Sequence, residues 1–227
     1  NHIPHAARAA GKRPPRLTGQ ALKSGRNPDA HLALLKKMHD ARGQVPAALL
    51  RLRALLSAHT VLGSHDDRSA PQRQNWAQMG VSICEFPEPY EVAKQANALG
   101  SPVVMGAPNL LRGGSHKGNI SVETLLAEGL CDALASDYHY PSLCQAALSL
   151  GADIGIAKAW ALVSSRPAQI LGLGDRGHLA LGQRADMVVL DRRSHAVEGT
   201  FAQGQPVHLT GGLAARMTGL VSGDAFG

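Results

Sequence analysis

Residues 105–140 read MGAPNLLRGGSHKGNISVETLLAEGLCDALASDYHY, and this stretch carries the clearest indication of the fold class. It starts at the end of an apolar run (102–105), crosses a glycine-rich basic loop and continues as a short helix pattern. It ends on a second apolar run (131–135) that leads directly to Asp137. Parallel strands of an α/β fold present polar groups at their carboxyl ends in this way. The stretch therefore predicts two parallel strands with a polar tip.

The same alternation continues on both sides of this stretch. Short apolar runs are separated by helical patterns of apolar residues, which predicts parallel βαβ units with right-handed crossovers. Upstream, Asn27 and Pro28 form a clear helix start, whereas residues 1–26 are predicted to be loop because of Pro14 and Pro15. The predicted strands are 61–65, 81–84, 103–105 and 132–136, and the predicted helices are 28–38, 46–58, 71–79, 91–99, 121–128, 141–149 and 156–163.

The pattern changes after Gly172. Residues 177–191 read as strand, turn, strand, and residues 200–202 and 206–209 flank a further turn. This predicts a small β element of three or four strands, which is marginal unless it packs on something else. The glycine-rich tail after Leu209 is predicted to fray.

Composition describes a globular protein of 227 residues, with 44% hydrophobic and 18% charged residues. The apolar runs are much shorter than the roughly 18 residues of a membrane span, and the amino end has no signal-peptide pattern. Three cysteines without CxxC spacing indicate buried thiols in a reducing compartment. We therefore expect a cytoplasmic protein that makes no membrane contact.

Charge is distributed unevenly along the chain. Residues 1–60 carry eleven Lys and Arg against two acidic residues, a formal charge of +9, so the remainder carries −3 of the total of +6. A basic segment attracts polyanions. The few aromatic residues do not interleave with it, which argues against a nucleic-acid partner and favours a phosphorylated small molecule.

Two residues at the ends of predicted strands are candidates for chemistry. His65 closes a buried strand, where it is either a metal ligand oriented by a nearby carboxylate or a structural loop histidine. Asp137 closes another strand, where it is either a general base or metal-binding carboxylate, or the N-cap of the next helix.

Residues 112–119 (RGGSHKGN) combine glycines with basic and donor side chains just before a helix. Glycines let backbone N–H groups approach an anion closely, and a helix start favours negative charge. The loop is not a Walker A sequence. The two readings left open are a phosphate-binding loop and a flexible surface loop.

Several segments together resemble one known family. LGSHDD (62–67), EFP (85–87), MGAPN (105–109), RGGSHKGN (112–119) and ASDY (135–138) resemble, in order and spacing, the α-D-ribose 1-methylphosphonate 5-triphosphate diphosphatase family of the amidohydrolase superfamily. This family belongs to the carbon–phosphorus lyase pathway. A further segment, GQRADMVVL (182–190), is similar to the closing β-sandwich of amidohydrolases in general.

The resemblance implies an α/β fold, here part of a (β/α)8 TIM-like barrel over residues 1–172 with a β-sandwich remnant over residues 173–227. It implies hydrolysis of the ribosyl triphosphate to a 5-phosphate and diphosphate. It also implies a divalent metal ion, zinc first, with manganese or magnesium as alternatives.

The family's functional residues transfer to this sequence by position. His65 resembles the histidine ligand of the sixth strand, Asp137 the eighth-strand aspartate that activates water, and His2 the fifth-strand histidine. The polyphosphate would contact a basic and glycine-rich set of residues: Lys12, Arg13, Arg16, Arg112, Gly113, Gly114, Ser115, His116, Lys117 and Asn119.

The family's first-strand metal ligands and its middle-strand bridging residue have no counterpart here. We therefore expect an amino-terminally truncated form with weak metal binding and little activity of its own. Exposed sheet edges in such a form favour association, so a homo-oligomer is also expected. The alternatives are another amidohydrolase, such as a deacylase or cyclic-amide hydrolase, and a non-catalytic polyphosphate-binding remnant.

Overall fold

The computed structural model describes residues 17–113 and 120–219. The chain divides into two compact units, with the boundary between Thr60 and Val61. The predicted division into residues 1–172 and 173–227 stays a prediction. None of the helices in the described ranges is long and apolar enough to cross a membrane.

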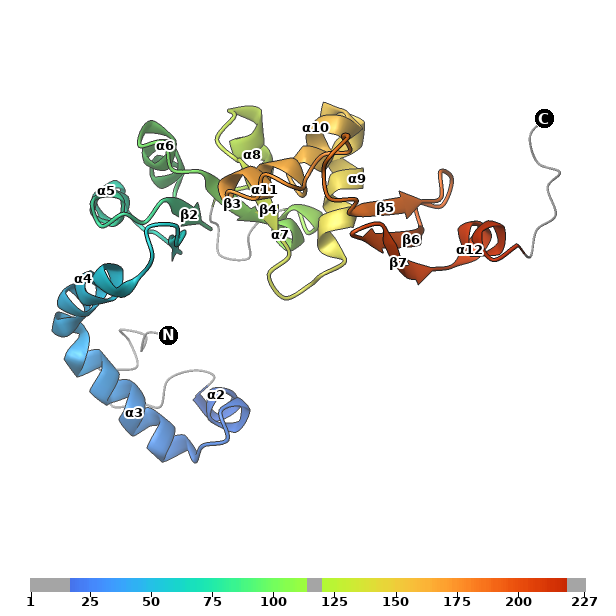
Figure 1. Cartoon of the computed structure of the whole chain (residues 1–227). Coiled ribbons are helices and arrows are strands. Elements are labelled where there is room, and N and C mark those ends of the chain that lie inside the picture. The colour runs from blue at the N-terminus through green and yellow to red at the C-terminus, as the bar shows by residue number, and fades with distance from the viewer. Residues whose placement is uncertain (1–16, 114–119, 220–227) are drawn as a thin grey trace. The chain divides into compact units, whose positions relative to one another are not determined.

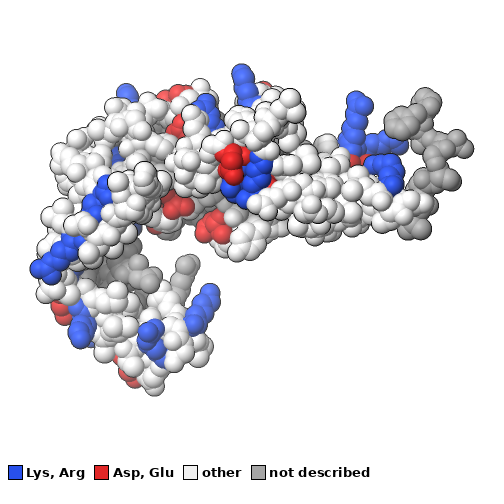
Figure 2. Space-filling view, viewed as in Figure 1, with Lys and Arg blue, Asp and Glu red and all other residues white. Residues whose placement is uncertain are grey.

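The first unit is helical (Figure 1). The predicted start of its longest helix is confirmed, because the Asn27 side chain accepts a hydrogen bond of 2.8 Å from the backbone N–H of Asp29. In the view of Figure 2, basic side chains outnumber acidic ones on this unit. Its helices are α2 (Leu17–Lys23), α3 (Pro28–Asp40), the 3-10 helix η1 (Ala41–Gln44) and α4 (Val45–Leu55).

Helix α2 corrects the prediction of a loop over residues 1–26. A proline breaks the interior of a helix and disfavours helix at the residue before it, but Leu17 follows the last of these prolines, so neither effect reaches α2. Leu17 and Ala21 lie four residues apart, and both are buried on one side of α2. Two apolar residues are too few to produce a recognisable helical pattern in the sequence, so α2 was not predicted.

The second unit contains a four-stranded parallel sheet in the order β1-β2-β3-β4. Each strand pairs with its predecessor in the chain, which confirms the predicted βαβ repeat. The strands are β1 (Gly63–His65), β2 (Ile83–Glu85), β3 (Val103–Gly106) and β4 (Ala133–Ala135). The helices are α5 (Ala70–Gln78), α6 (Tyr90–Ala98), α7 (Ala107–Leu111), α8 (Val122–Ala127), α9 (Ser142–Ile154), α10 (Ile156–Ala161) and α11 (Ser165–Ile170).

The two faces of this sheet differ in burial. Ser64 is in register with Cys84, and Cys84 with Val103; all three are buried. The next row contains His65, Glu85 and Val104, which are exposed or half-buried. Successive residues of a strand point to opposite faces, so the buried row lies in the core and His65 lies on the open face.

A second, antiparallel sheet contains β5 (Met187–Leu190), β6 (Val197–Ala202) and β7 (Gln205–Leu209). The predicted strand pair around Gln203 and Gly204 is confirmed. The prediction of a strand that begins at residue 177 is wrong, since no strand forms between residues 171 and 186. The β-sandwich itself stays a prediction.

Helix α12 (Gly211–Met217) occupies the segment that was predicted to fray. Its start is stabilised by the Glu198 carboxylate, which accepts hydrogen bonds from the N–H groups of Gly212 (3.0 Å) and Leu213 (3.3 Å). Carboxylates stabilise helix starts in this way. The prediction was wrong because the stabilising group lies on β6, distant in sequence.

Candidate functional site

His65 ends β1 with its ring on the open face of the sheet. Its side chain is 56% exposed, and its Nδ1 lies 3.3 Å from the Asp66 carboxylate. The ring meets the edge of Phe86 with centroids 5.0 Å apart and an interplanar angle of 76°. An exposed imidazole with a carboxylate at one nitrogen has the donor chemistry of a metal ligand or a general base.

Three residues next to strand ends adopt left-handed backbone conformations. Asp66 follows β1 with φ 58°, Phe86 follows β2 with φ 53°, and Asp137 comes two residues after β4 with φ 50°. Aspartate tolerates this region, but a bulky aromatic residue is a genuine outlier there. Hydrogen bonds to the neighbouring strand hold two of them, from Asp66 N to Glu85 O (3.1 Å) and from Phe86 N to Val104 O (2.9 Å). Such strained positions gather at functional sites.

Arg112, just after α7, connects the loops that follow β3 and β4. Its guanidinium lies over the Tyr138 ring at 5.6 Å from the centroid. Its Nε donates to Pro108 O (3.1 Å), and its Nη2 donates to Asn109 Oδ1 (3.2 Å). The structure thus places Arg112, a predicted phosphate-binding residue, in contact with Tyr138, which follows Asp137 in the sequence.

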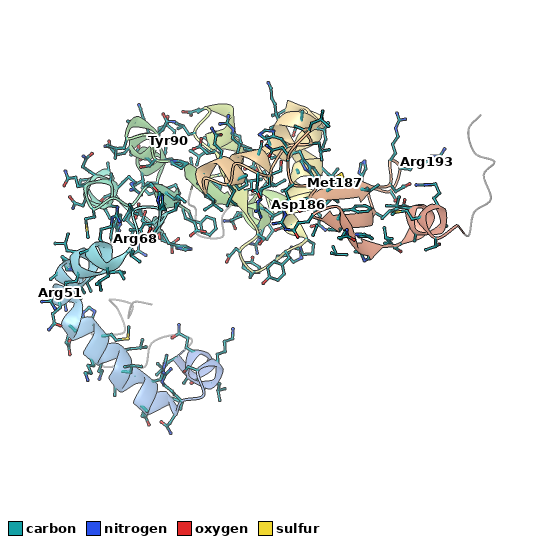
Figure 3. All side chains as sticks on the ribbon, in the orientation of Figure 1. Arg51, Arg68, Tyr90, Asp186, Met187 and Arg193 are labelled. Atoms are coloured by element: carbon teal, nitrogen blue, oxygen red, sulfur yellow. The ribbon has the colours of Figure 1, made fainter. Side chains whose placement is uncertain are left out.

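The loops after β1 and β2 are also joined. Arg68, labelled in Figure 3, forms an ion pair of 3.1 Å with Glu88. The Glu88 N–H donates to Asp67 O (2.9 Å), and the Glu88 carbonyl accepts from Ile120 N (3.1 Å). Glu88 therefore links the His65 loop to the residue that follows the RGGSHKGN segment.

Of the predicted site residues, four are described: His65, Asp137, Arg112 and Gly113, the last with φ 72°. The structure places His65 at the carboxyl end of β1, and the other three after the carboxyl ends of β3 and β4. The remaining predicted residues lie outside the described ranges: His2, Lys12, Arg13, Arg16, Gly114, Ser115, His116, Lys117 and Asn119.

The sheet order separates His65 from Asp137. Two strands, β2 and β3, lie between β1 and β4, and at about 4.8 Å per strand the two backbones are roughly 14 Å apart. A sixth-strand histidine and an eighth-strand aspartate would have one strand between them, so the two strand numbers cannot both apply. The chemical roles of His65 and Asp137 stay predictions. Within residues 17–113 and 120–219, no three His, Cys, Asp or Glu side chains gather to hold a metal ion. The described residues alone therefore do not form a metal site.

A buried polar cluster behind β1 was missed from the sequence. It contains Asp67 and Arg73, both fully buried and 3.4 Å apart, together with Ser64 and Cys84. Burial and then the nearby Asp67 carboxylate raise the pKa of Cys84 to about 12, so this thiol stays protonated at neutral pH. One signal in the sequence could have indicated this cluster: Arg73 lies on the inward side of the predicted helix 71–79.

Residues 105–208 match the model of the amidohydrolase family. Over 173 residues, which are 74% of this chain, the sequence is 38% identical to the α-D-ribose 1-methylphosphonate 5-triphosphate diphosphatase of Escherichia coli (strain K12). The chain spans about 44% of the length of that relative.

Two solved structures show the same fold at low sequence identity. A protein described as uncharacterized matches with a TM-score of 0.51 and 21% identity, over 67% of this chain and 46% of its own. A prolidase complexed with N-methylphosphonate-L-proline matches with a TM-score of 0.50 and 20% identity, over the same shares. They support the α/β arrangement of parallel strands and helices.

Proposed function

We propose that this chain, whose residues 105–208 carry amidohydrolase-family sequence, hydrolyses α-D-ribose 1-methylphosphonate 5-triphosphate in phosphonate catabolism. The observation that carries the proposal is the 38% identity, over 74% of this chain, to a diphosphatase of that substrate. The substrate is a phosphorylated small molecule, in keeping with the basic residues of the chain.

The site supports this assignment through its charges. The Arg112 guanidinium is fixed by Pro108, Asn109 and Tyr138. A guanidinium suits a phosphate because its planar fork presents paired N–H donors. Asp137 is adjacent to Tyr138 in the chain, so a cation for the phosphates and a carboxylate for the water belong to neighbouring loops.

In the proposed reaction, the oxygen of a water molecule forms a bond to the α-phosphorus, and the bond from that phosphorus to the bridging oxygen of the β-phosphate breaks. The products are the 5-phosphate and diphosphate. We assign Asp137 to accept the proton of the attacking water. Arg112 would balance negative charge on the polyphosphate.

A divalent metal ion, zinc with manganese or magnesium as alternatives, remains part of this proposal. Such an ion, when bound, would lower the pKa of a bound water. Its ligands would have to include residues beyond the described ones. His65 is the described residue with the best donor chemistry for it.

The strand order supports an arc of a (β/α)8 barrel. Every strand is adjacent to its predecessor, and right-handed crossovers then place every connecting helix on one face of the sheet. A doubly wound sheet instead reverses its strand order and carries helices on both faces. The β-sandwich remnant would be the sheet of β5, β6 and β7.

A cytoplasmic location is also proposed. Cys84 and Cys131 are buried free thiols, and Cys144 is a half-buried one. Burial raises the pKa of Cys131 to about 12. Free thiols of this kind are typical of proteins in reducing compartments. A homo-oligomer is also proposed, because the edges of the parallel sheet can pair with another copy.

Measuring product formation by phosphorus NMR tests the function. The purified chain, incubated with the ribosyl triphosphate and zinc, manganese or magnesium, should release diphosphate and the 5-phosphate in equal amounts, at a low rate in keeping with the weak metal binding expected from its sequence. Asp137→Asn should lower the rate of release by about 10²–10⁴ while retaining substrate binding. Binding without any turnover by the unmodified chain would instead favour a polyphosphate-binding protein, and neither binding nor turnover would reject the assignment.

A further inference from the structure

Arg73 is a fully buried arginine on α5 whose guanidinium reaches across the start of the parallel sheet. One of its terminal nitrogens, Nη1, donates to Ser64 Oγ (2.8 Å), to Ile83 O (3.1 Å) and to the Asp67 carboxylate (3.4 Å). The other, Nη2, donates to Val81 O. A single side chain therefore joins β1, the loop after it and the segment that enters β2.

Asp67 completes this connection from the other side of His65. Its Oδ2 accepts a hydrogen bond of 2.7 Å from Ser64 Oγ and lies 3.8 Å from the Cys84 thiol. Its backbone carbonyl accepts from Glu88 N (2.9 Å). Ser64 and Asp67 flank His65 and Asp66 in sequence, so both ends of this short segment are held by the same buried cluster.

Stability alone is a poor explanation for the cluster. Removing two charges from water is costly, and well-packed apolar residues often replace a buried ion pair without loss. In the described part of the chain, Asp67 Oδ1 and Arg73 Nε have no hydrogen-bond partner. What the cluster does provide is geometric definition, because each hydrogen bond fixes a direction as well as a distance.

The cluster holds the main chain on both sides of a left-handed turn. Ser64 points into the core while His65 points to the open face, and Asp66 is held at φ 58°. We propose that Arg73, acting through Ser64 and Asp67, is a positioning residue that fixes the main chain of residues 64–67 and so orients the His65 ring against Phe86. The inference deepens the proposed function, in which His65 is a metal-binding residue.

The test compares Ser64→Ala and Arg73→Lys with the unmodified full chain. Ser64→Ala removes one bridging hydroxyl with little change of volume, whereas Arg73→Lys keeps the charge but loses the fork. Leu125→Ala is the control, since it opens a cavity in the core at α8, and Leu125 makes none of the hydrogen bonds of the cluster. His65→Gln identifies the His65 ring signals in NMR spectra.

In the unmodified chain, we expect an NOE between the His65 and Phe86 rings and a ring-current shift of the His65 ring protons. Ser64→Ala and Arg73→Lys should weaken or abolish both, while Leu125→Ala should retain them even though it lowers Tm. Unchanged His65 ring signals in a folded Ser64→Ala or Arg73→Lys variant would overturn the proposal. If Arg73→Lys does not fold, Ser64→Ala alone decides.

Zinc titration separates this inference from the proposed function. If the full chain binds zinc through His65, the two cluster variants should lower its zinc affinity by roughly tenfold, the lower end of the effect of supporting residues at metal sites. If His65→Ala leaves zinc affinity unchanged, the proposed role of His65 as a ligand is wrong. The NMR comparison then still decides whether Arg73 orients the ring.

Discussion

The guanidinium of Arg112 lies 5.6 Å from the centre of the Tyr138 ring, and this contact joins the loop after β3 to the loop after β4. Tyr138 is 64% exposed, so the ring is not buried for stability. A cation over an aromatic face is attracted by the negative face of the ring. The tyrosine next to Asp137 thus fixes the arginine expected to hold phosphate.

Replacing Tyr138 should weaken substrate binding without removing any charge. An exposed cation–π contact contributes about 0.5–1 kcal/mol, so Tyr138→Ala should raise the Kd for the triphosphate by about two- to fivefold. Tyr138→Phe should have little effect, because the ring face remains. Tyr140→Ala is the control, since Tyr140 is 82% exposed and close in sequence. Calorimetric titration measures all three, and equal effects at Tyr138 and Tyr140 would reject the contact.

Arg112 and Asp137 should fail in different ways when replaced. Arg112→Ala removes a charge-assisted hydrogen-bond donor worth about 1.5–3 kcal/mol, so KM should rise by ten- to a hundredfold with a smaller change in kcat. Asp137→Asn removes the base, so kcat should fall by about 10²–10⁴ with KM nearly unchanged. Steady-state kinetics checks this split. A matching loss of kcat in both variants would mean that the roles are misassigned.

The parallel strands followed from the sequence because each apolar run was separated from the next by a helical pattern. The positions of His65 and Asp137 at the ends of strands also followed from the sequence alone. Helix α3 was predictable because its start signal, Asn27, is local. These features depend on residues that are neighbours in the chain.

The remaining features depend on contacts between distant residues. The Arg112–Tyr138 contact joins residues 26 positions apart, and Ser64 Oγ also accepts from an arginine nine positions away. The sequence predicted that the GQRAD segment connects two strands, but it did not show the partners of Asp186. The Asp186 carboxylate accepts hydrogen bonds from the Arg184 side chain and from the Gln203 N–H. No periodicity encodes such partners, so the left-handed turns and the partners of the buried arginine could not be predicted.

Asp186, labelled in Figure 3 and immediately before β5, should make the antiparallel sheet sensitive to acid. The hydrogen bond from Gln203 N (2.9 Å) and then the Arg184 side chain (2.8 Å) lower the pKa of this carboxyl below its ordinary value of 3.8. A group with a lowered folded pKa contributes stability that is fully present above its unfolded pKa and is lost as pH falls through its folded pKa. The loss should therefore occur below about pH 3.8.

Hydrogen exchange checks this prediction at one amide. Protection of the Gln203 N–H should fall as the pH is lowered through this window, after correction for intrinsic exchange rates. Asp186→Asn should remove the pH dependence, because its amide does not titrate. A Gln203 amide whose protection tracks that of β6 at every pH, in both proteins, would show that Asp186 does not hold the turn.

Gly211 should be the critical residue for docking of α12. Its φ of 57° disfavours any side chain, and an added Cβ would collide with Glu198 Oε1, the atom that accepts from Gly212. Left-handed backbone costs roughly 1–2 kcal/mol for an L-residue, so Gly211→Ala should release the helix from β6. Gly212→Ala is the matched control, because its nearest contact, at 3.3 Å, is the flexible end of Arg216. Limited proteolysis within residues 211–217 should be faster in Gly211→Ala and unchanged in Gly212→Ala, and equal rates in the two variants would mean that Glu198 does not anchor the helix.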